Sequence, residues 1–362
     1  MALLIYGATG FTGTLASHHA HHLSIPLILG GRNASKLSTL ATTLSSSAVA
    51  PAAPIPICVF DVTADTQLID QSLRGVAVLL SCAGPFARTA APLIAACIRT
   101  GVHYLDVAAE LVSYQLAEER SEDARRKGVM LMPGAGGSVA MLGCLAGRAV
   151  AGFVSAAEAE AEGDKKEEEK KQQAVARIDI ALRVAGPLSR GTLASAAEAS
   201  IMQAGCLQRV DGELVALDPG AGVAAALFDF QNGKGEVPCV PATLPDLMTL
   251  PRSTGVQSVR TYVHAADGAF ADAEGEQEGE QEKEGPTAEE RDKYPCRAAV
   301  VVVGADGAER REVLHTLNGY DFTAIASVRA AQRVLQGVAE PGWQTPAGVF
   351  GDGFAFSVGR DV

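Results

Sequence analysis

Hydrophobic residues in the first third of the chain gather in short runs separated by longer amphipathic stretches. A run at Ala2–Tyr6 leads through a glycine-rich turn into a helical stretch that ends near Leu23, and a second run follows at Pro26–Leu29. Helical periodicity is clearest over Thr89–Thr100 and Leu111–Lys127. The remaining apolar runs are Ile55–Phe60, Val76–Cys82, Val102–Val107 and Val129–Met132. This alternation predicts an α/β fold with a doubly wound parallel sheet, whose ligands bind beyond the carboxyl ends of the strands.

The pattern changes after Pro133, where strand candidates become fewer and longer. The elements expected beyond it are one further helix, a strand over Ala174–Ala185, a helix over about Thr192–Ala204, strands over Ser258–Ala265 and Ala298–Gly304, and a helix over Phe322–Gln336. We therefore predict two domains, a parallel-sheet domain over residues 1–134 and an α+β domain over residues 135–317.

The net charge of −12 is confined to two low-complexity segments. Glu158–Gln173 holds seven acidic residues and four lysines, and Asp267–Asp292 holds eleven acidic residues against Lys283 and Arg291. Segments of this composition bury little apolar surface, so we expect mobile loops, with a helical extension as the alternative for Glu158–Gln173. The rest of the chain is neutral, which argues against nucleic-acid binding.

Neither the cysteines nor the apolar runs indicate a secreted or membrane protein. The seven cysteines include no C-x-x-C pair, which argues against a zinc site or a disulfide framework and favours a reducing, cytoplasmic compartment. We expect no signal peptide before Ala2–Tyr6 and no membrane span, because the longest apolar run, Val76–Ala87, is far shorter than the ~20 residues required. His18 and His22 lie one helical turn apart without a third ligand, so we expect no metal site.

The turn after the first strand has a GxxGxxG spacing. Between a strand and a helix, the first glycine permits a tight turn, the second lets backbone amides approach a pyrophosphate, and the third lets the helix pack on the strand. The anion then meets the helix N-terminus. The residues predicted to bind the phosphates of a dinucleotide in a Rossmann domain are Gly7, Ala8, Thr9, Gly10, Phe11, Thr12 and Gly13.

The end of the second strand predicts which dinucleotide binds. An NAD-selective protein has an acidic residue there for the ribose 2′-hydroxyl, but this chain has Gly30-Gly31-Arg32-Asn33. Arg32 can offer its planar guanidinium to a 2′-phosphate, with Lys36 as a second cation and Asn33 as a neutral donor. We therefore predict NADP(H) as the cofactor.

Two further strand ends supply candidate cofactor contacts. Asp61, after the third strand, can accept a hydrogen bond from the adenine amino group or cap the next helix through Thr63 or Asp65. The fourth strand closes with small residues and a proline, where backbone must pass close to the ribose and nicotinamide. Those candidates are Cys82, Ala83, Gly84 and Pro85.

The fifth strand supplies the candidate catalytic residues. Asp106 and Glu110 follow it at the edge where ligands bind, and Tyr104 lies beside them. A carboxyl group there can donate a proton or orient a substrate amine. The alternative is a helix N-cap with an acidic first turn.

Several of these motifs resemble the saccharopine dehydrogenase-like oxidoreductases, and within them the trans-acting enoyl reductases. The resemblance covers the first domain well, and weaker matches lie at Arg190–Ser195, Gly319-Tyr320, Thr345–Ala347 and Phe350–Asp352. The motifs that carry it are Ile5–Gly13, Gly31-Arg32-Asn33, Cys82–Phe86, and His103–Val107 with Glu110. The two acidic insertions and residues 151–298 depart from the family.

The resemblance implies NADP(H) rather than a metal and a Rossmann domain completed by residues 318–362. It also implies that residues 135–317 form an inserted substrate or dimerisation domain, so a homodimer is expected. A small-molecule or carrier-bound acyl substrate and a carrier-protein or synthase partner follow from the same resemblance.

The leading hypothesis is a cytoplasmic NADPH-dependent oxidoreductase that transfers hydride to a C=C (enoyl) or C=N bond. No tyrosine is followed four residues later by lysine, which excludes the acid/base pair of short-chain dehydrogenases. A saccharopine- or imine-type reductase is disfavoured because no Arg/Lys cluster for two carboxylates is recognisable in the second domain. A non-catalytic NADP(H) sensor that binds a protein partner is the alternative from another class.

Overall fold

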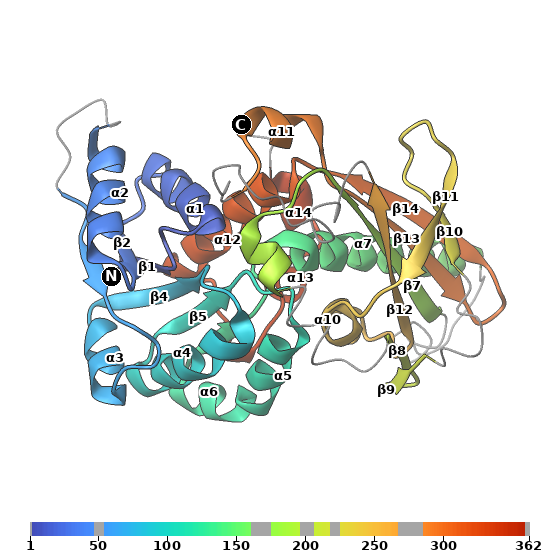
Figure 1. Cartoon of the computed structure of the whole chain (residues 1–362). Coiled ribbons are helices and arrows are strands. Elements are labelled where there is room, and N and C mark those ends of the chain that lie inside the picture. The colour runs from blue at the N-terminus through green and yellow to red at the C-terminus, as the bar shows by residue number, and fades with distance from the viewer. Residues whose placement is uncertain are drawn as a thin grey trace.

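The first domain is built on a seven-stranded sheet whose strands all run parallel (Figure 1). The computed structural model describes residues 2–46, 54–160, 175–195, 206–217, 225–266 and 285–358. The strand order is β15-β6-β5-β4-β1-β2-β3, so the order reverses between β1 and β4. The bounds are β1 Ala2–Tyr6, β2 Leu27–Gly31, β3 Ile57–Val59, β4 Val76–Ser81, β5 His103–Asp106, β6 Met130–Met132 and β15 Gly342–Trp343. The predicted doubly wound Rossmann fold is confirmed.

Helices cover both faces of this sheet. One face packs against α1 (Phe11–His22), α2 (Ala34–Ser46), α7 (Gly137–Glu160) and α12 (Gly319–Leu335). The other face packs against α3 (Thr66–Ser72), α4 (Phe86–Thr100), α5 (Leu111–Glu119) and α6 (Ser121–Lys127). The short helices α13 (Pro346–Phe350) and α14 (Phe354–Ser357) follow β15 near the end of the chain.

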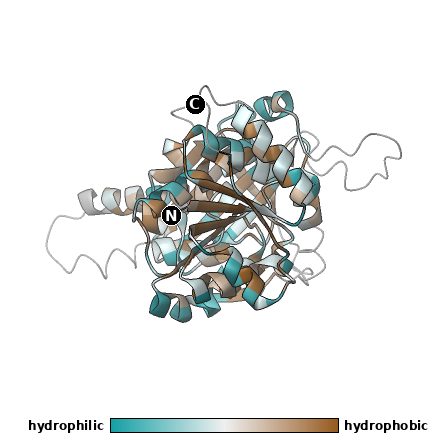
Figure 2. Cartoon of the chain, turned by 90° about the vertical axis from the view of Figure 1, so that its left-hand side faces the viewer, coloured by the Kyte–Doolittle hydropathy of each residue, from teal (hydrophilic) through white to brown (hydrophobic). Residues whose placement is uncertain are grey.

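The side chains of β1 alternate between the two faces of the sheet, and each set is buried in the hydrophobic core on its own face. Leu3 and Ile5 are buried on the face of α1 and α12, whereas Leu4 and Tyr6 are buried on the face of α4. Successive side chains of a strand point to opposite faces, so a strand covered on both sides is apolar at every position. Figure 2 shows hydrophobic strands at the centre, surrounded by helices that mix hydrophilic and hydrophobic residues.

The second domain is built on a mixed eight-stranded sheet. Its main path is β10-β11-β12-β7-β13-β14, and the β8–β9 hairpin joins β12. β7 and β12 are parallel, and β13 runs antiparallel to β7. The bounds are β7 Val175–Ala185, β8 Leu207–Val210, β9 Glu213–Ala216, β10 Ala226–Asp229, β11 Glu236–Pro241, β12 Val259–Ala266, β13 Arg297–Gly304 and β14 Glu309–His315.

Helix α7 lies between the two sheets (Figure 1). It packs on β7, β13 and β14 of the second sheet and on α12, α13 and α14 of the first domain, with α10 (Asp246–Thr254) beside it. Its stretch Gly137–Ala156 is long and apolar enough to cross a membrane, but half of that stretch is buried inside the protein. Core helices of globular proteins share this composition.

Two expectations about individual elements need correction. The helix expected over Leu111–Lys127 is divided at Arg120, which ends α5 and precedes α6. The division allows the Ser121 hydroxyl to accept a hydrogen bond from the Trp343 backbone N–H at 3.0 Å, which ties α6 to β15. Part of the loop expected over Asp267–Asp292 is helix α11 (Ala288–Lys293).

Helix α11 forms because Thr287 and Glu290 make a complete capping box at its N-terminus. Residues 267–284 and 161–174 of the two acidic segments lie outside the described residues, and residues 158–160 end α7. Of the helix expected over Thr192–Ala204, residues 190–195 are described and helical. The short strands β8, β9, β10, β11 and β14 and the helix α10 were not expected from the sequence.

Candidate functional site: a dinucleotide cleft at the carboxyl edge of the parallel sheet

The glycine motif forms the tight turn between β1 and α1. Gly7 has φ +80°, and a Cβ at Gly7 would lie 2.8 Å from the Ala83 backbone nitrogen. A Cβ at Gly13 would lie 2.1 Å from the Gly7 carbonyl oxygen, well inside van der Waals contact. The same oxygen accepts a hydrogen bond from the Gly10 N–H at 3.0 Å. Gly7 and Gly13 are therefore required by the packing of turn, helix and neighbouring strand.

Gly10 differs from the other two glycines because it is exposed. It precedes α1, whose first amides point away from the helix body, and a Cβ at Gly10 would meet only the Gly7 carbonyl oxygen, at 3.4 Å. A side chain here would instead fill the open space in front of the helix N-terminus. An uncharged, sterically open N-terminus at the strand-order reversal fits the pyrophosphate of a dinucleotide.

Arg32 lies at the carboxyl end of β2, and its side chain is 76% exposed. Its Nη1 is 3.8 Å from Oδ2 of Asp61. The Asp61 carboxylate also accepts hydrogen bonds from the backbone N–H (2.8 Å) and the hydroxyl (2.7 Å) of Thr63, and these, with a smaller contribution from Arg32, lower the pKa of Asp61. Asp61 thus orders the loop before α3, whose N-cap is Asp65. Its proposed contact with adenine stays a prediction.

Asn33 and Lys36 lie at the start of α2. The side-chain oxygen of Asn33 accepts a hydrogen bond from the Lys36 backbone N–H at 3.0 Å, which caps the helix. The Asn33 amide group keeps its N–H donors, which is the role expected for it beside a 2′-phosphate. Arg32, Asn33 and Lys36 therefore lie within one turn of the β2 end.

We expect Arg32→Ala to weaken NADPH binding by roughly 1.5 to 3 kcal/mol, the scale of one charge-assisted hydrogen bond, and to leave NADH binding unchanged. Parallel fluorescence titrations with NADPH and NADH measure both affinities. Wild-type protein should prefer NADPH by at least about tenfold, or ~1.4 kcal/mol. Arg120→Ala, which removes an exposed arginine from the α5–α6 junction, is the control. Equal NADPH affinity in wild type and Arg32→Ala would remove Arg32 from the site.

The loop after β4 has an exposed glycine at its centre. Gly84 is exposed, and the Gly84–Pro85 peptide bond is cis. The Thr89 hydroxyl of α4 donates a hydrogen bond to the Ala83 carbonyl at 2.6 Å, which fixes the loop against the helix. Burial raises the pKa of the Cys82 thiol to about 12, so it stays protonated at neutral pH and does not act as a nucleophile.

Asp106 is fully buried at the end of β5 and accepts four hydrogen bonds. Oδ2 accepts from the Tyr104 hydroxyl (2.8 Å) and the Ser113 hydroxyl (3.1 Å). Oδ1 accepts from the backbone N–H groups of Ala108 (2.9 Å) and Gly134 (2.8 Å). Burial raises the pKa of Asp106 to about 6, although the four donors oppose that rise. Asp106 therefore ties β5 to α5 and to the start of the connection between the domains.

Glu110 is also buried, and both of its carboxylate oxygens are occupied. Oε1 accepts from the Phe86 N–H at 3.1 Å and Oε2 from the Ala87 N–H at 2.8 Å. These are the first amides of α4, so Glu110 stabilises the N-terminus of that helix from the neighbouring strand connection. Tyr104, Asp106 and Glu110 are thus brought together behind the β4 and β5 ends, and their catalytic assignment stays a prediction.

The connection Gly134–Gly137 is packed tightly. Gly134 has φ +66°, and a Cβ at Gly136 would lie 2.6 Å from the Thr323 carbonyl oxygen of α12. Gly134 and Gly136 are buried. The glycines therefore allow close approach of α12 to the carboxyl edge of β6.

Residues that were not among the predicted site residues also lie beside the glycine turn and the loop after β4. Residue Ser195 has its hydroxyl oxygen 3.3 Å from the position of a Cβ at Gly84. The Tyr320 hydroxyl of α12 accepts a hydrogen bond from the Ser189 N–H at 2.7 Å, and the Tyr320 ring packs edge-on against Phe11 at 5.1 Å. Arg291 of α11 lies over the Phe11 ring, 5.7 Å from its centroid, and pairs with Asp321. The weak family matches at Arg190–Ser195 and Gly319-Tyr320 were the only signal for these contacts.

A family model matches the part of the chain that forms the dinucleotide site. Residues 3–132 match the model of the saccharopine dehydrogenase NADP binding domain. The first domain is therefore similar to this NADP-binding domain over almost its whole length. The predicted family resemblance and the NADP cofactor are confirmed at this level, and the match ends where the Gly134–Gly137 connection begins.

Curated relatives match about a third of this chain. Over 113 residues the chain is 34% identical to a trans-acting enoyl reductase of Mycobacterium leprae, which is 30% of this chain and 26% of that protein. A saccharopine dehydrogenase-like oxidoreductase of Bos taurus is 26% identical over 145 residues, 37% of this chain and 34% of that protein. The structure of GenD2 from gentamicin A biosynthesis in complex with NAD aligns over 100% of this chain and 94% of that chain, with 13% identity and a TM-score of 0.44. The matched region spans about a quarter of the length of the enoyl reductases.

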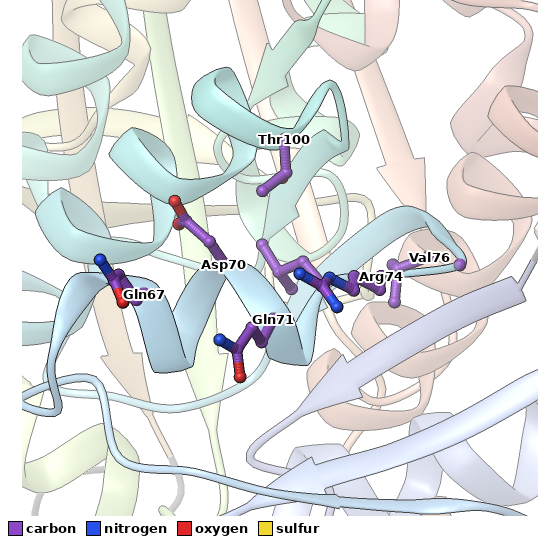
Figure 3. A pocket seen from close by; sticks show the side chains of 8 residues that line it. Gln67, Asp70, Gln71, Arg74, Val76 and Thr100 are labelled. Atoms are coloured by element: carbon purple, nitrogen blue, oxygen red, sulfur yellow. The ribbon is translucent and has the colours of Figure 1, made fainter.

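A cavity of about 550 Å³ lies at the opposite edge of the NADP-binding domain (Figure 3). Gln67, Asp70 and Gln71 line it from α3, Arg74 lines it from the turn after α3, and Val76 marks the amino end of β4. Ligands of doubly wound sheets bind at the carboxyl ends of the strands. The cavity is therefore not part of the dinucleotide site.

Asp246, the first residue of α10, is an unexpected buried carboxyl group. It is fully buried, and neither of its oxygens has a hydrogen-bond partner among the described residues. Burial raises the pKa of Asp246 to about 7. Burial raises the pKa of Tyr114, and the charge of Asp246 adds to that rise. The Tyr114 hydroxyl donates a hydrogen bond to the Ala108 carbonyl behind β5. A protonatable group of the second domain therefore lies near the Tyr104–Asp106 cluster.

Proposed function

We propose that this chain is an NADPH-dependent reductase that transfers hydride to a C=C bond of an enoyl substrate, either a small molecule or a carrier-bound acyl chain. The observation that carries the proposal is the presence of two features side by side. The NADP-binding turn is open at Gly10, and Ser195 of the second domain lies beside Gly84, just after the neighbouring strand β4. A substrate held by that segment would meet the nicotinamide end of the cofactor. The likeness to trans-acting enoyl reductases supports the choice of substrate class.

When bound, NADPH supplies the hydride from its nicotinamide ring. Gly7, Gly10 and Gly13 hold the pyrophosphate at the start of α1, and Arg32 binds the 2′-phosphate. Asp106 and Glu110 act on the substrate end as positioning residues, because their hydrogen bonds fix the β5 and α4 ends that face it. Tyr104 supports Asp106 through its hydroxyl. We propose these three roles in place of direct proton donation.

The relatives called trans-acting enoyl reductases support a further part of the proposal. We propose that this chain also acts with a partner enzyme, a synthase or the carrier protein that holds the acyl chain. A homodimer through the second domain is the oligomeric state that we propose. Reduction of a C=N bond, as the saccharopine dehydrogenase family name suggests, is the competing reaction.

A specific observation favours a second candidate function, a non-catalytic NADP(H) sensor. Both carboxylates behind the cleft, Asp106 and Glu110, have their oxygens occupied by hydrogen bonds from the protein. A sensor would bind NADP⁺ and NADPH without consuming either.

Turnover of NADPH separates the two candidates. We expect purified protein to consume NADPH, measured by loss of its absorbance, when supplied with short enoyl thioesters, and to do so far more slowly with NADH. Cyclic imines are the matched test of C=N reduction. Saturable NADPH binding without consumption on either substrate class would contradict the reductase and favour the sensor.

A further inference from the structure

A row of basic side chains crosses the second sheet on the face opposite α7. In the antiparallel pair of β7 and β13, Arg183 lies directly opposite Arg297. The register continues outward to His264 of β12 and to His315 of β14. The row thus places two arginines side by side with a histidine at each end. Like charges directly opposite each other destabilise a strand pair, so this row concentrates positive charge on one face of the sheet.

The hairpin of β10 and β11 folds over this row and closes one side of it. The imidazole of His315 donates a hydrogen bond from Nε2 to the Phe230 carbonyl at 2.7 Å. The imidazole of His264 donates from Nδ1 to the Pro238 carbonyl at 2.9 Å. Both histidines therefore hold the hairpin, and the hairpin turn brings Asn232 and Lys234 to the arginines.

These elements enclose a cavity of about 440 Å³. The described residues that line it are Arg183, Asn232, Lys234, Lys293, Tyr294, Pro295 and Arg297. Four of them are cationic and none is acidic, in a chain whose net charge is −12. Arg183 is only 5% exposed, and the Nε of Arg297 is buried with no hydrogen-bond partner among the described residues. A buried guanidinium donor without an acceptor costs free energy unless a ligand supplies one.

We propose that this cavity binds an oxyanion, the phosphate or carboxylate group of a ligand carried by the second domain. Arg297 supplies a buried donor, and Arg183, Lys293 and Lys234 add positive charge around the cavity. Phosphate and carboxylate groups require such a combination of donors and charge. The site is separate from the turn that binds the pyrophosphate of NADP. It needs no hydride transfer, so it stands whether or not the reductase proposal holds.

The test is calorimetric titration of the full chain with inorganic phosphate and, separately, with glutarate, in the presence of saturating NADP⁺. NADP⁺ keeps the phosphate positions of the first domain filled. We expect saturable binding of at least one anion, weakened at least about tenfold by Arg297→Gln and by Lys293→Gln. Lys293 is exposed, so its replacement should leave the fold intact even if Arg297→Gln does not. Arg260→Gln, which removes a cation from the same face four residues along β12 from His264, should bind as wild type.

The two anions distinguish the source of the ligand. Binding of phosphate alone assigns the site to a phosphorylated ligand, and binding of glutarate alone assigns it to a carboxylate ligand. Failure of both anions to bind would overturn the site. Equal weakening by Arg260→Gln and Lys293→Gln would also overturn it, because the effect would then be one of overall charge.

Discussion

Gly13→Ala is expected to lose NADPH binding by at least about a hundredfold, or ~2.7 kcal/mol. The new methyl group would lie 2.1 Å from the Gly7 carbonyl oxygen, which belongs to the backbone and cannot rotate away. Helix α1 would have to move off β1, and the turn that accepts the Gly10 N–H would open. Overpacking of this kind also lowers the free energy of unfolding by about 1 to 3 kcal/mol. Fluorescence titration and urea unfolding measure the two effects.

Gly353→Ala is the matched control, since no atom lies within 4 Å of a Cβ at Gly353 and its φ of −73° suits alanine. It should bind NADPH as wild type and unfold at the same or slightly higher urea concentration. Wild-type NADPH affinity in Gly13→Ala would show that the cofactor does not approach the GxxGxxG turn.

Asp246→Asn is expected to stabilise the protein above pH 7 by about 2 to 4 kcal/mol. Burial raises the pKa of Asp246 from 3.8 to about 7, so the folded protein holds its proton more tightly than the unfolded chain. The stability from this group is complete below about pH 4 and is lost as the pH rises to about 7, at ~1.4 kcal/mol per pH unit. Asparagine stays uncharged at every pH, so the variant does not lose this part of the free energy of unfolding as the pH rises. Urea unfolding from pH 4 to pH 8 measures the difference.

The control for Asp246→Asn is Asp292→Asn, an exposed acid of α11, which should leave the pH profile unchanged. Asp106, whose pKa is raised to about 6, should keep a smaller decline in both variants. A loss of stability at pH 8 in Asp246→Asn would mean that the ionised carboxylate has a partner in the native protein. The same variant tested for turnover shows whether a protonatable group at this position takes part in the reaction.

Local sequence was enough to predict the NADP-binding domain. The strand β1, the GxxGxxG turn and helix α1 are contiguous, so their geometry follows from short-range sterics at Gly7 and Gly13. Arg32 could also be predicted as the ligand of the 2′-phosphate, because β2 ends at a fixed distance from that turn. The alternating apolar runs then defined a parallel sheet buried on both faces.

The second domain was harder to predict because its strands are short and pair across long stretches of sequence. β8 to β11 are four to six residues long and partly exposed, which leaves little hydrophobic periodicity. Because these strands were not expected, no Arg/Lys cluster was recognisable in the second domain from the sequence. Arg183, Lys234, Lys293 and Arg297 are distant in sequence, and only the register of β7 and β13 and the hairpin turn gather them.

The sequence by itself was enough to predict the Rossmann turn, the binding of NADP and the family resemblance, because each depends on residues that are neighbours in the chain. Only the tertiary structure decided what the buried acids do. The sequence predicted that Asp106 and Glu110 donate a proton, orient a substrate amine or cap a helix, and folding surrounds both with hydroxyl and amide donors from other elements. Asp246 carried no local signal. It is buried because α10 packs against α7, and its oxygens have no hydrogen-bond partner among the described residues. Charge and proton affinity depend on the neighbours in space, which the chain order does not specify.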